Sequence, residues 1–143
     1  INLERATLIL CGKLVYEGNE AAFINLSRNK AILIVLSYIE LIKTKRTINL
    51  NLIGGILGGT YWGWMYVDIL WVREDHRGRG IGSKLLCAAE KEAKSRGCHH
   101  VHLDTMSWQA PEFYKKKGYE VIGILPDIPS GHQKYLLMKA LHS

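Results

Sequence analysis

The sequence has few cysteines, few prolines and no long hydrophobic run. Its three cysteines are odd in number and lack CxxC spacing, which argues against a disulfide framework or a zinc knuckle. The longest apolar stretch, Ala31–Ile42, contains Glu40 and is too short to span a bilayer. The N-terminus also lacks the order of segments found in a secretory signal. We therefore expect a cytoplasmic protein with no membrane partner.

The composition indicates one folded domain that covers residues 1–143. Hydrophobic residues make up 48% of the chain and charged residues 22%, which suits a buried core rather than disorder. The net charge of +6, from 19 basic and 13 acidic residues, favours an anionic partner. Composition alone does not choose among a phosphorylated cofactor, a nucleic acid and an acidic membrane.

The first half of the chain predicts strands after a segment that fits one or two helices, Lys13–Leu26. The runs Ala31–Leu41 and Thr47–Gly59 flank the polar Lys43–Arg46 and predict a hairpin. Residues Thr60–Val72 alternate with period 2 and predict a further strand. One face of that strand would carry Met65, Val67, Ile69 and Trp71, and the other Trp64, Tyr66 and Asp68.

An amphipathic helix is predicted from Ile81 to Ala93, with Gly97 at its stop. Two charged pairs would support its outer face, Glu90/Lys94 and Glu92/Arg96. The elements that follow are a strand at His99–Thr105, a helix from an N-cap at Ser107 to Gly118, and strands at Tyr119–Leu125 and Lys134–Leu141. This order predicts a mixed α/β fold.

A glycine-rich loop, Arg77–Lys84, lies between a predicted strand and the amphipathic helix. Free amide groups at a helix start, together with the positive end of its dipole, suit a phosphate. The order Gly82-Ser83-Lys84 does not fit a Walker A loop. A dinucleotide fingerprint fails as well, because Ser83 stands where the third glycine would fall after Gly78. The remaining match is R-x-x-G-x-G.

That match resembles the pyrophosphate loop of the GNAT superfamily of N-acetyltransferases. The resemblance extends to Leu70-Trp71-Val72 before the loop and to a later helix motif, formed by Ser107, Ala110, Phe113, Tyr114, Gly118 and Tyr119. Ser107 stands where the family pattern usually has Asn. The stretches LDTMSWQAPEFY and LPDIPSGHQKYLL look like a bacterial subgroup. The family implies a central, mostly antiparallel twisted sheet of six to seven strands, with helices on both faces and a splay between the two strands that flank the cofactor.

The resemblance implies acetyl-CoA as the donor and a primary amine of a small molecule or peptide as the acceptor. The residues expected to contact the cofactor are Leu70, Trp71, Val72, Arg77, Gly78, Arg79, Gly80, Ile81, Gly82, Ser83, Lys84, Ser107, Gln109, Phe113 and Tyr114. A bulge in the strand before the loop would open the slot for the thioester. A homodimer, paired through exposed sheet edges or the final hairpin, is compatible with this family.

Tyr114 is the expected general acid, because a phenol of pKa near 10 is protonated at neutral pH. Asp68 is the candidate base for the amine, with Asp104 in reserve. Trp64 and Tyr66 share the face of Asp68 and suit a cation, although a core role fits such a stripe as well. His99, His100 and His102 lack helical metal-ligand spacing, so no metal is expected.

Two other functions are compatible with the sequence. One is a protein of this fold that binds CoA without catalysis. The other is a nucleic-acid-binding module, suggested by the charge and by Lys115–Lys117. That triplet also fits a solvated helix C-terminus, and we expect no nucleic-acid partner.

Overall fold

The computed structural model describes residues 9–16, 19–20, 24–26 and 52–142. The elements are β1 (Ile9–Tyr16), β2 (Asn19–Glu20), β3 (Ile24–Leu26), β4 (Leu52–Tyr61), β5 (Trp64–Val72), η2 (Glu74–His76), α2 (Ile81–Ser95), β6 (His100–Met106), α3 (Pro111–Lys116), β7 (Glu120–Pro126) and β8 (Gln133–Ala140). Within this part of the chain, no helix has the length and apolar character that a membrane crossing requires.

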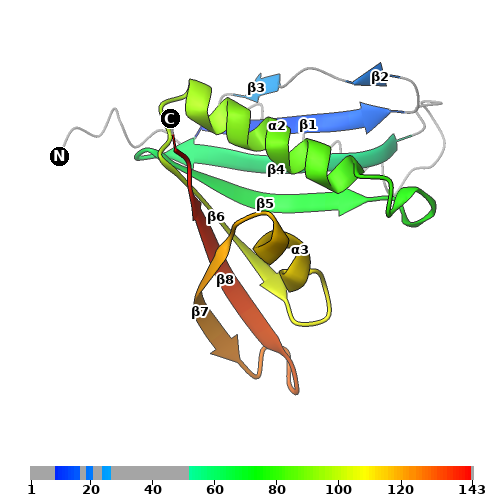
Figure 1. The fold of residues 1–143 in the computed structure, drawn as a ribbon, viewed down its shortest axis with the longest axis vertical. Helices are drawn as coiled ribbons and strands as arrows, with labels where there is room; N and C mark the ends of the chain where they lie inside the picture. The colour runs from blue at the N-terminus through cyan, green and yellow to red at the C-terminus, as the bar shows by residue number, and fades with distance from the viewer. Residues whose placement is uncertain (1–8, 17–18, 21–23, 27–51, 143) are drawn as a thin grey trace.

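The described strands form one mixed sheet in the order β2-β1-β4-β5-β6-β8-β7, with β3 paired to β1 outside this path. β5 and β6 run parallel, and the other pairs are antiparallel. In Figure 1 the half that contains β4 and β5 and the half that contains β6, β8 and β7 diverge from a common end. The predicted mixed α/β class is confirmed, and the described residues contain eight strands where we expected six to seven. α2 and α3 lie on the same face in this view, and a helix on the other face stays a prediction.

A β-bulge in β5 causes this divergence. The ladder between β5 and β6 ends at Val67. On the other edge of β5, Gly58 pairs with Val67 and Leu57 pairs with Ile69, which leaves Asp68 as an extra residue. An extra residue bends its strand and increases the local twist. The expected bulge and splay are therefore confirmed at Asp68.

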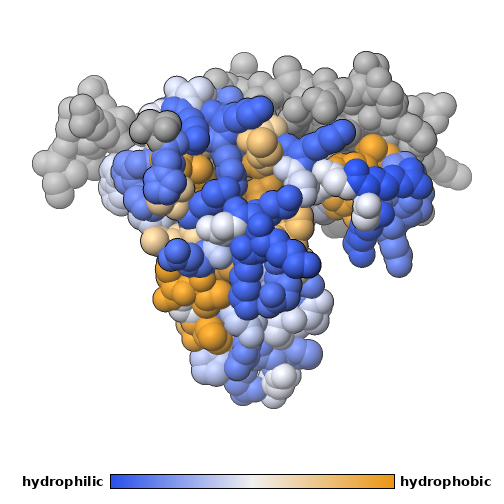
Figure 2. All heavy atoms as spheres, in the orientation of Figure 1, coloured by the Kyte–Doolittle hydropathy of each residue, from blue (hydrophilic) through white to orange (hydrophobic). Residues whose placement is uncertain are grey.

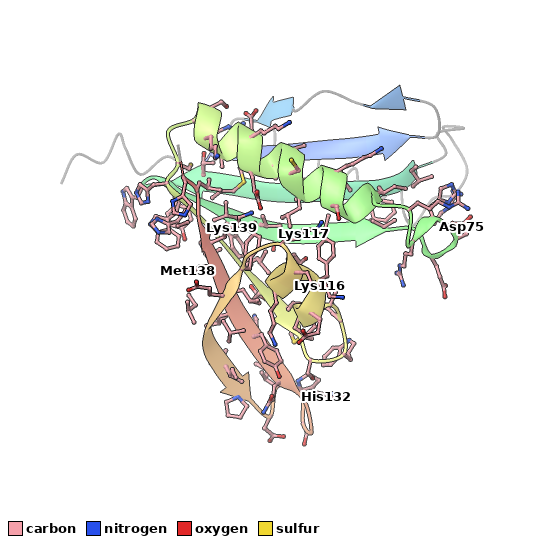
Figure 3. The ribbon with its side chains drawn as sticks, in the orientation of Figure 1. Asp75, Lys116, Lys117, His132, Met138 and Lys139 are labelled. Atoms are coloured by element: carbon pink, nitrogen blue, oxygen red, sulfur yellow. The ribbon has the colours of Figure 1, made fainter. Side chains whose placement is uncertain are left out.

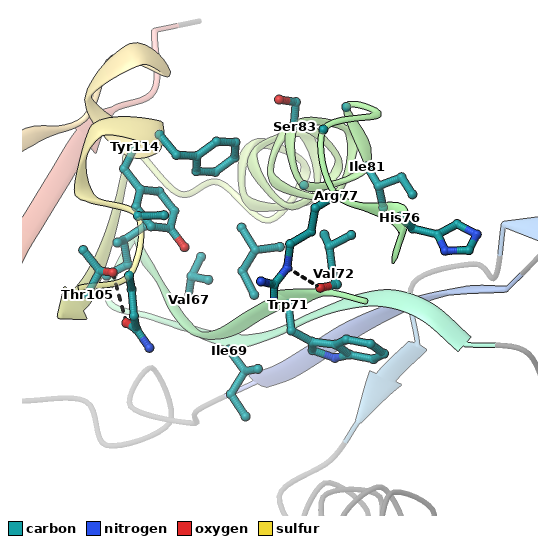
Figure 4. A pocket seen from close by; sticks show the side chains of 18 of the residues that line it. Val67, Ile69, Trp71, Val72, His76, Arg77, Ile81, Ser83, Thr105 and Tyr114 are labelled. Atoms are coloured by element: carbon teal, nitrogen blue, oxygen red, sulfur yellow. Dashed lines mark hydrogen bonds between the residues drawn. The ribbon is translucent and has the colours of Figure 1, made fainter. Parts of the chain in front are cut away.

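Gly58 makes room for the bulge, because a Cβ at this position would overlap the backbone carbonyl oxygen of Tyr66. The bulge also reverses the alternation of side chains along β5. Beyond it, Leu70 and Val72 pack against the core, whereas we expected Ile69 and Trp71 to share the face of Val67. That expectation is wrong, because one inserted residue moves every later side chain to the other face. Figure 4 shows Ile69 and Trp71 on the opposite side of β5 from Val67 and Val72.

The core lies between the sheet and α2. Four residues of α2 are buried, namely Leu85, Leu86, Ala89 and Ala93. They pack against β5, β6 and β8 through residues such as Met65, Val101 and Leu137. The helix ends near Gly97, whose φ of +76° confirms the predicted stop.

One predicted surface pair of α2 is wrong. Arg96 does pair with Glu92 at 2.7 Å. Glu90, however, accepts hydrogen bonds from Lys139 Nζ and from the Tyr119 hydroxyl, each at 3.0 Å. Figure 3 shows Lys139 of β8 beneath α2. Glu90 therefore joins α2 to the last strand, a contact that helical spacing alone cannot reveal.

Three other predictions about local structure are wrong. The described parts of Lys13–Leu26 are strands, because β1 pairs with β4 along its length. β4 has β1 on one edge and β5 on the other, so it does not form the predicted hairpin with Ala31–Leu41; the latter segment lies outside the described residues. The predicted strand Thr60–Val72 is split by a turn at Trp62-Gly63, where both φ angles are positive.

The C-terminal half follows the prediction closely, apart from one helix start. α3 begins at Pro111 with Ala110 as its N-cap, and Ser107 lies in the preceding turn. Proline at the first helical position accounts for the later start. β7 is an edge strand whose apolar side chains remain exposed, including Val121, Ile122, Ile124 and Leu125. Figure 2 shows apolar atoms gathered near β7.

Candidate active site

A cleft of about 970 Å³ opens where β5 and β6 diverge. One wall is β5 from Val67 to Val72, and the other contains the end of β6 and the start of α3. The loop before α2 closes one end, as Figure 4 shows. The lining residues that the sequence had predicted are Asp68, Leu70, Trp71, Val72, Arg77, Gly78, Gly80, Ile81, Gly82, Ser83, Gln109, Phe113 and Tyr114.

The loop and the first turn of α2 present backbone amide groups at this end of the cleft. The first helical hydrogen bond runs from Lys84 N–H to Gly80 O at 3.0 Å. The amides of residues 81–83 precede that bond and are the donors that a helix start offers to an anion. Gly80 has a φ of +78°, a conformation that favours glycine, and a Cβ there would meet nothing within 4 Å. The residues present therefore fit a phosphate group.

The basic residues of the loop differ in their positions. Arg77 lines the cleft and donates from Nε to the Val72 carbonyl oxygen at 3.0 Å. This bond ties the loop to the end of β5. Arg79 and Lys84 are exposed and do not line the cleft. Their expected contact with the cofactor stays a prediction that this geometry does not support.

The edge of β5 beyond the bulge faces the cleft. On this side its ladder with β6 stops at Val67, so β6 does not pair with β5 beyond that residue. A strand edge that its neighbour no longer covers can accept an extended amide-bearing chain as an additional strand. On this stretch of β5 the Val72 carbonyl accepts from Arg77.

Tyr114 is buried on α3 and lines the opposite wall. Its ring packs edge-on against Phe113 and Tyr119, with ring centroids 5.1 and 5.9 Å away. Figure 4 shows its hydroxyl pointing into the cleft. Burial, and then the charge of Asp104, raises the pKa of Tyr114 above its ordinary value. The hydroxyl is therefore protonated at neutral pH and available as a proton donor.

Two residues of the β6–α3 turn were expected to contact the cofactor, and the structure separates them. The Gln109 Oε1 atom accepts from Thr105 Oγ1 at 3.1 Å and from Met106 N–H at 3.0 Å. These bonds hold its side chain at the cleft wall. Ser107 does not line the cleft, and its Oγ accepts a hydrogen bond from the backbone N–H of Gln133 at 3.3 Å. Ser107 thus ties the turn to β8.

Two carboxylates line the middle of the cleft, where Asp68 occupies the bulge and Asp104 stands on β6. The Tyr66 hydroxyl donates to Asp104 Oδ1 at 3.1 Å. Burial, followed by Asp104 and then Asp68, raises the pKa of Tyr66 to about 12, which keeps this donor protonated. Lys134 Nζ lies 3.1 Å from Asp104 Oδ2. Asp68 is exposed and has no ion pair with any described residue.

Aromatic and histidine side chains continue from Tyr66 toward the start of β5 and β6. Trp64 stacks on His100 with ring centroids 4.4 Å apart. The Tyr61 hydroxyl lies 2.8 Å from His102 Nε2. Burial lowers the pKa of His102 despite the opposing charge of Asp104. In the described part of the chain, no group of histidine, cysteine or acidic side chains is arranged to hold a metal.

Sequence reasoning did not assign several lining residues to the cleft, including Val67, His76, Leu103, Thr105 and Trp108. Trp108 is 53% exposed and packs against His132 of the last hairpin with ring centroids 4.7 Å apart. The period-2 pattern of β6 places Leu103 and Thr105 on one face of the strand. Their position in the cleft can be inferred only once the divergence of β5 and β6 is known. Lys134 carried no local signal, because only strand pairing brings it to Asp104.

Comparisons with known proteins agree with this arrangement. The sequence model of the acetyltransferase (GNAT) family matches residues 33–119. Blasticidin-S acetyltransferase from Streptomyces morookaense is 42% identical over 92 residues, which cover 64% of this chain and 68% of that relative. Acetyltransferase Atu2258 from Agrobacterium fabrum is 43% identical over 88 residues, which cover 62% of this chain and 64% of that relative.

A solved structure supports the same assignment over a larger share of the chain. The crystal structure of an acetyltransferase from Bacillus cereus superposes with a TM-score of 0.63 and 33% identity, and the match covers 85% of this chain and 98% of that one. The two curated relatives are matched over only about two thirds of their own length. The family match itself covers more than half of this chain. This protein is therefore an acyltransferase that belongs to the GNAT family of acetyltransferases.

Proposed function

We propose that this protein transfers an acetyl group from acetyl-CoA to a primary amine of a small molecule or peptide, by direct attack within a ternary complex. One observation supports the proposal: the cleft has a helix start with phosphate-compatible amides at one end, and a protonated tyrosine on the wall that faces β5 beyond its ladder with β6. A donor with a diphosphate, an amide-bearing arm and a thioester has the three parts that these features match.

The donor would be held by groups at successive positions along the cleft. The amides of residues 81–83 and the Arg77 guanidinium would bind the diphosphate, each charge-assisted bond contributing roughly 1.5–3 kcal/mol. The backbone of Leu70 and Trp71 would pair with the arm, and Gln109 and Phe113 would contact it from the other wall. Bound acetyl-CoA would supply the electrophilic thioester carbonyl and a thiolate leaving group.

The protons would be handled by two side chains on opposite walls. Tyr114 would donate a proton to the departing sulfur, because its raised pKa keeps the hydroxyl protonated. Asp68 would take the proton that the amine must lose, directly or through water. An alkyl ammonium with a pKa of about 10.4 is almost fully protonated at pH 7, so this step is required. We favour Asp68 over Asp104, because Lys134 already neutralises Asp104.

The acceptor would approach along the face of β5 and β6 that carries the carboxylates. Tyr66, Trp64 and His102 provide aromatic surface beside them, which suits a cation. The relative from Streptomyces is named for a small molecule, blasticidin-S, so small molecules are the first acceptors to test. A homodimer stays a prediction, and the exposed apolar edge of β7 is where it would form.

The test is a panel of amines incubated with acetyl-CoA while the free CoA thiol is measured. Asp68→Asn should lower turnover by about a hundredfold. Asp127→Asn is the matched control, because Asp127 lies between β7 and β8 and does not line the cleft, and it should keep full turnover. Thermal shift should show stabilisation by acetyl-CoA. No stabilisation at millimolar acetyl-CoA, or no thiol release with any amine, would contradict the proposal.

A further inference from the structure

Lys134 is a positive charge placed next to Asp104, one of the two carboxylates of the cleft. Its Nζ lies 3.1 Å from Asp104 Oδ2, and the two side chains are 27% and 25% exposed. Strand pairing fixes this contact. Lys134 pairs with Met106 and Leu136 pairs with Asp104, so Lys134 and Asp104 are diagonal neighbours on one face of the sheet. The ion pair is therefore part of the β6–β8 ladder.

The ionisable side chains near the expected position of the amine set the net charge there. The Tyr66 hydroxyl lies between Asp104 and Asp68 and stays neutral. Tyr114, which faces Asp104 from α3, is also neutral. Two carboxylates and one ammonium leave a net charge of about −1, and that charge belongs to Asp68, the carboxylate with no ion pair among the described residues.

We propose that Lys134 is a specificity-determining residue that restricts the acceptor to a single positive charge beside the cleft carboxylates. This rests on the proposed function, because it assigns these carboxylates to the acceptor. One ammonium group of the acceptor meets the unpaired charge of Asp68. A second ammonium group finds Asp104 already paired and meets the positive charge of Lys134. Short diamines are therefore bound less well than monoamines of the same length.

The test compares 1-aminobutane with 1,4-diaminobutane, measured as dissociation constants by ligand-observed NMR on the CoA-loaded protein. Lys134→Gln removes the charge while keeping most of the side-chain length. We expect it to shift the ratio of the two constants about tenfold in favour of the diamine, the order expected for one unit charge at close range in a partly solvated site. Asp104→Asn leaves Lys134 unpaired and should shift the ratio in the opposite direction.

Two control variants separate this effect from changes in fold or overall charge. Lys134→Arg keeps the positive charge and should keep the ratio of the wild-type protein within about twofold. Lys94→Gln removes an exposed charge from the last turn of α2 and should also leave the ratio unchanged. An unchanged ratio in Lys134→Gln, or an equal shift in Lys94→Gln, overturns the proposal.

Binding is measured separately from transfer so that the two proposals can fail independently. If thiol release is absent with every amine, the proposed function fails, and the ratio of dissociation constants still decides the role of Lys134. If thiol release occurs but the ratio does not respond to Lys134→Gln, only the role of Lys134 is lost.

Discussion

Tyr114 and Tyr119 are two buried tyrosines with ring centroids 5.9 Å apart whose hydroxyls have different surroundings. The Tyr114 hydroxyl points into the cleft, whereas the Tyr119 hydroxyl donates to Glu90 Oε1 at 3.0 Å. Removing each hydroxyl by phenylalanine keeps both rings and their packing. The pair therefore tests whether the cleft hydroxyl acts in catalysis or only in structure.

We expect Tyr114→Phe to lower kcat about a hundredfold, which corresponds to about 2.7 kcal/mol of transition-state free energy. Its dissociation constant for CoA and its melting temperature should change little, because the ring is retained. Tyr119→Phe should keep kcat and lose about 1.5 kcal/mol of stability, the low end for a bond to a charged group, since Lys139 still binds Glu90. For a chain of 143 residues this is a fall of about 5 °C in melting temperature.

The measurements are thiol release under saturating amine, calorimetric titration with CoA, and thermal denaturation. A wild-type kcat in Tyr114→Phe would rule out a catalytic role of this hydroxyl. The same conclusion would follow if kcat falls only in proportion to a loss of CoA binding, or if Tyr119→Phe lowers kcat equally. In those cases Tyr114 would be a packing residue of the cleft wall.

Three further predictions follow from the backbone and the tyrosines. Gly58→Ala should destabilise the fold by about 1–3 kcal/mol and weaken CoA binding, because its Cβ overlaps the Tyr66 carbonyl oxygen at the bulge; unchanged denaturation and CoA affinity would disprove this. Gly80→Ala should lose about 1 kcal/mol in chemical denaturation through its positive φ, while the control Gly82→Ala, with ordinary contacts and no positive φ, should gain about 0.5 kcal/mol. The contribution of Tyr66 and Tyr119 to stability should be constant below pH 10 and fall from pH 10 to 12, because the folded state raises the pKa of Tyr66 to about 12 and also that of Tyr119. The tyrosinate absorbance of these two residues should therefore appear only as the protein unfolds. Ionisation of every tyrosine near pH 10 in the folded protein would contradict this expectation.

The elements of the C-terminal half could be predicted from the sequence because their signals are local. The helical spacing from Ile81 and the positive φ of Gly97 depend only on nearby residues. The Trp62-Gly63 turn also had a local signal, an X-Gly pair, but the period-2 pattern around it was interpreted as one strand. The N-terminal strand β1 carried no such signal, since only its pairing with β4 distinguishes it from a helix.

The glycine-rich helix start and the α/β class could be predicted from the sequence, because the conformational freedom of glycine and the period of apolar residues act over a few positions. The cleft position of Tyr114 was predicted from the family resemblance and is seen in the structure. The position of the β5 bulge, the face that Leu70 takes, and the acidic partners of Lys134 and Lys139 could be found only in the folded chain. Those features depend on the register between strands that are far apart in the chain. A shift of one residue in that register moves the side chains to the opposite face of the sheet and leaves the local sequence pattern unchanged.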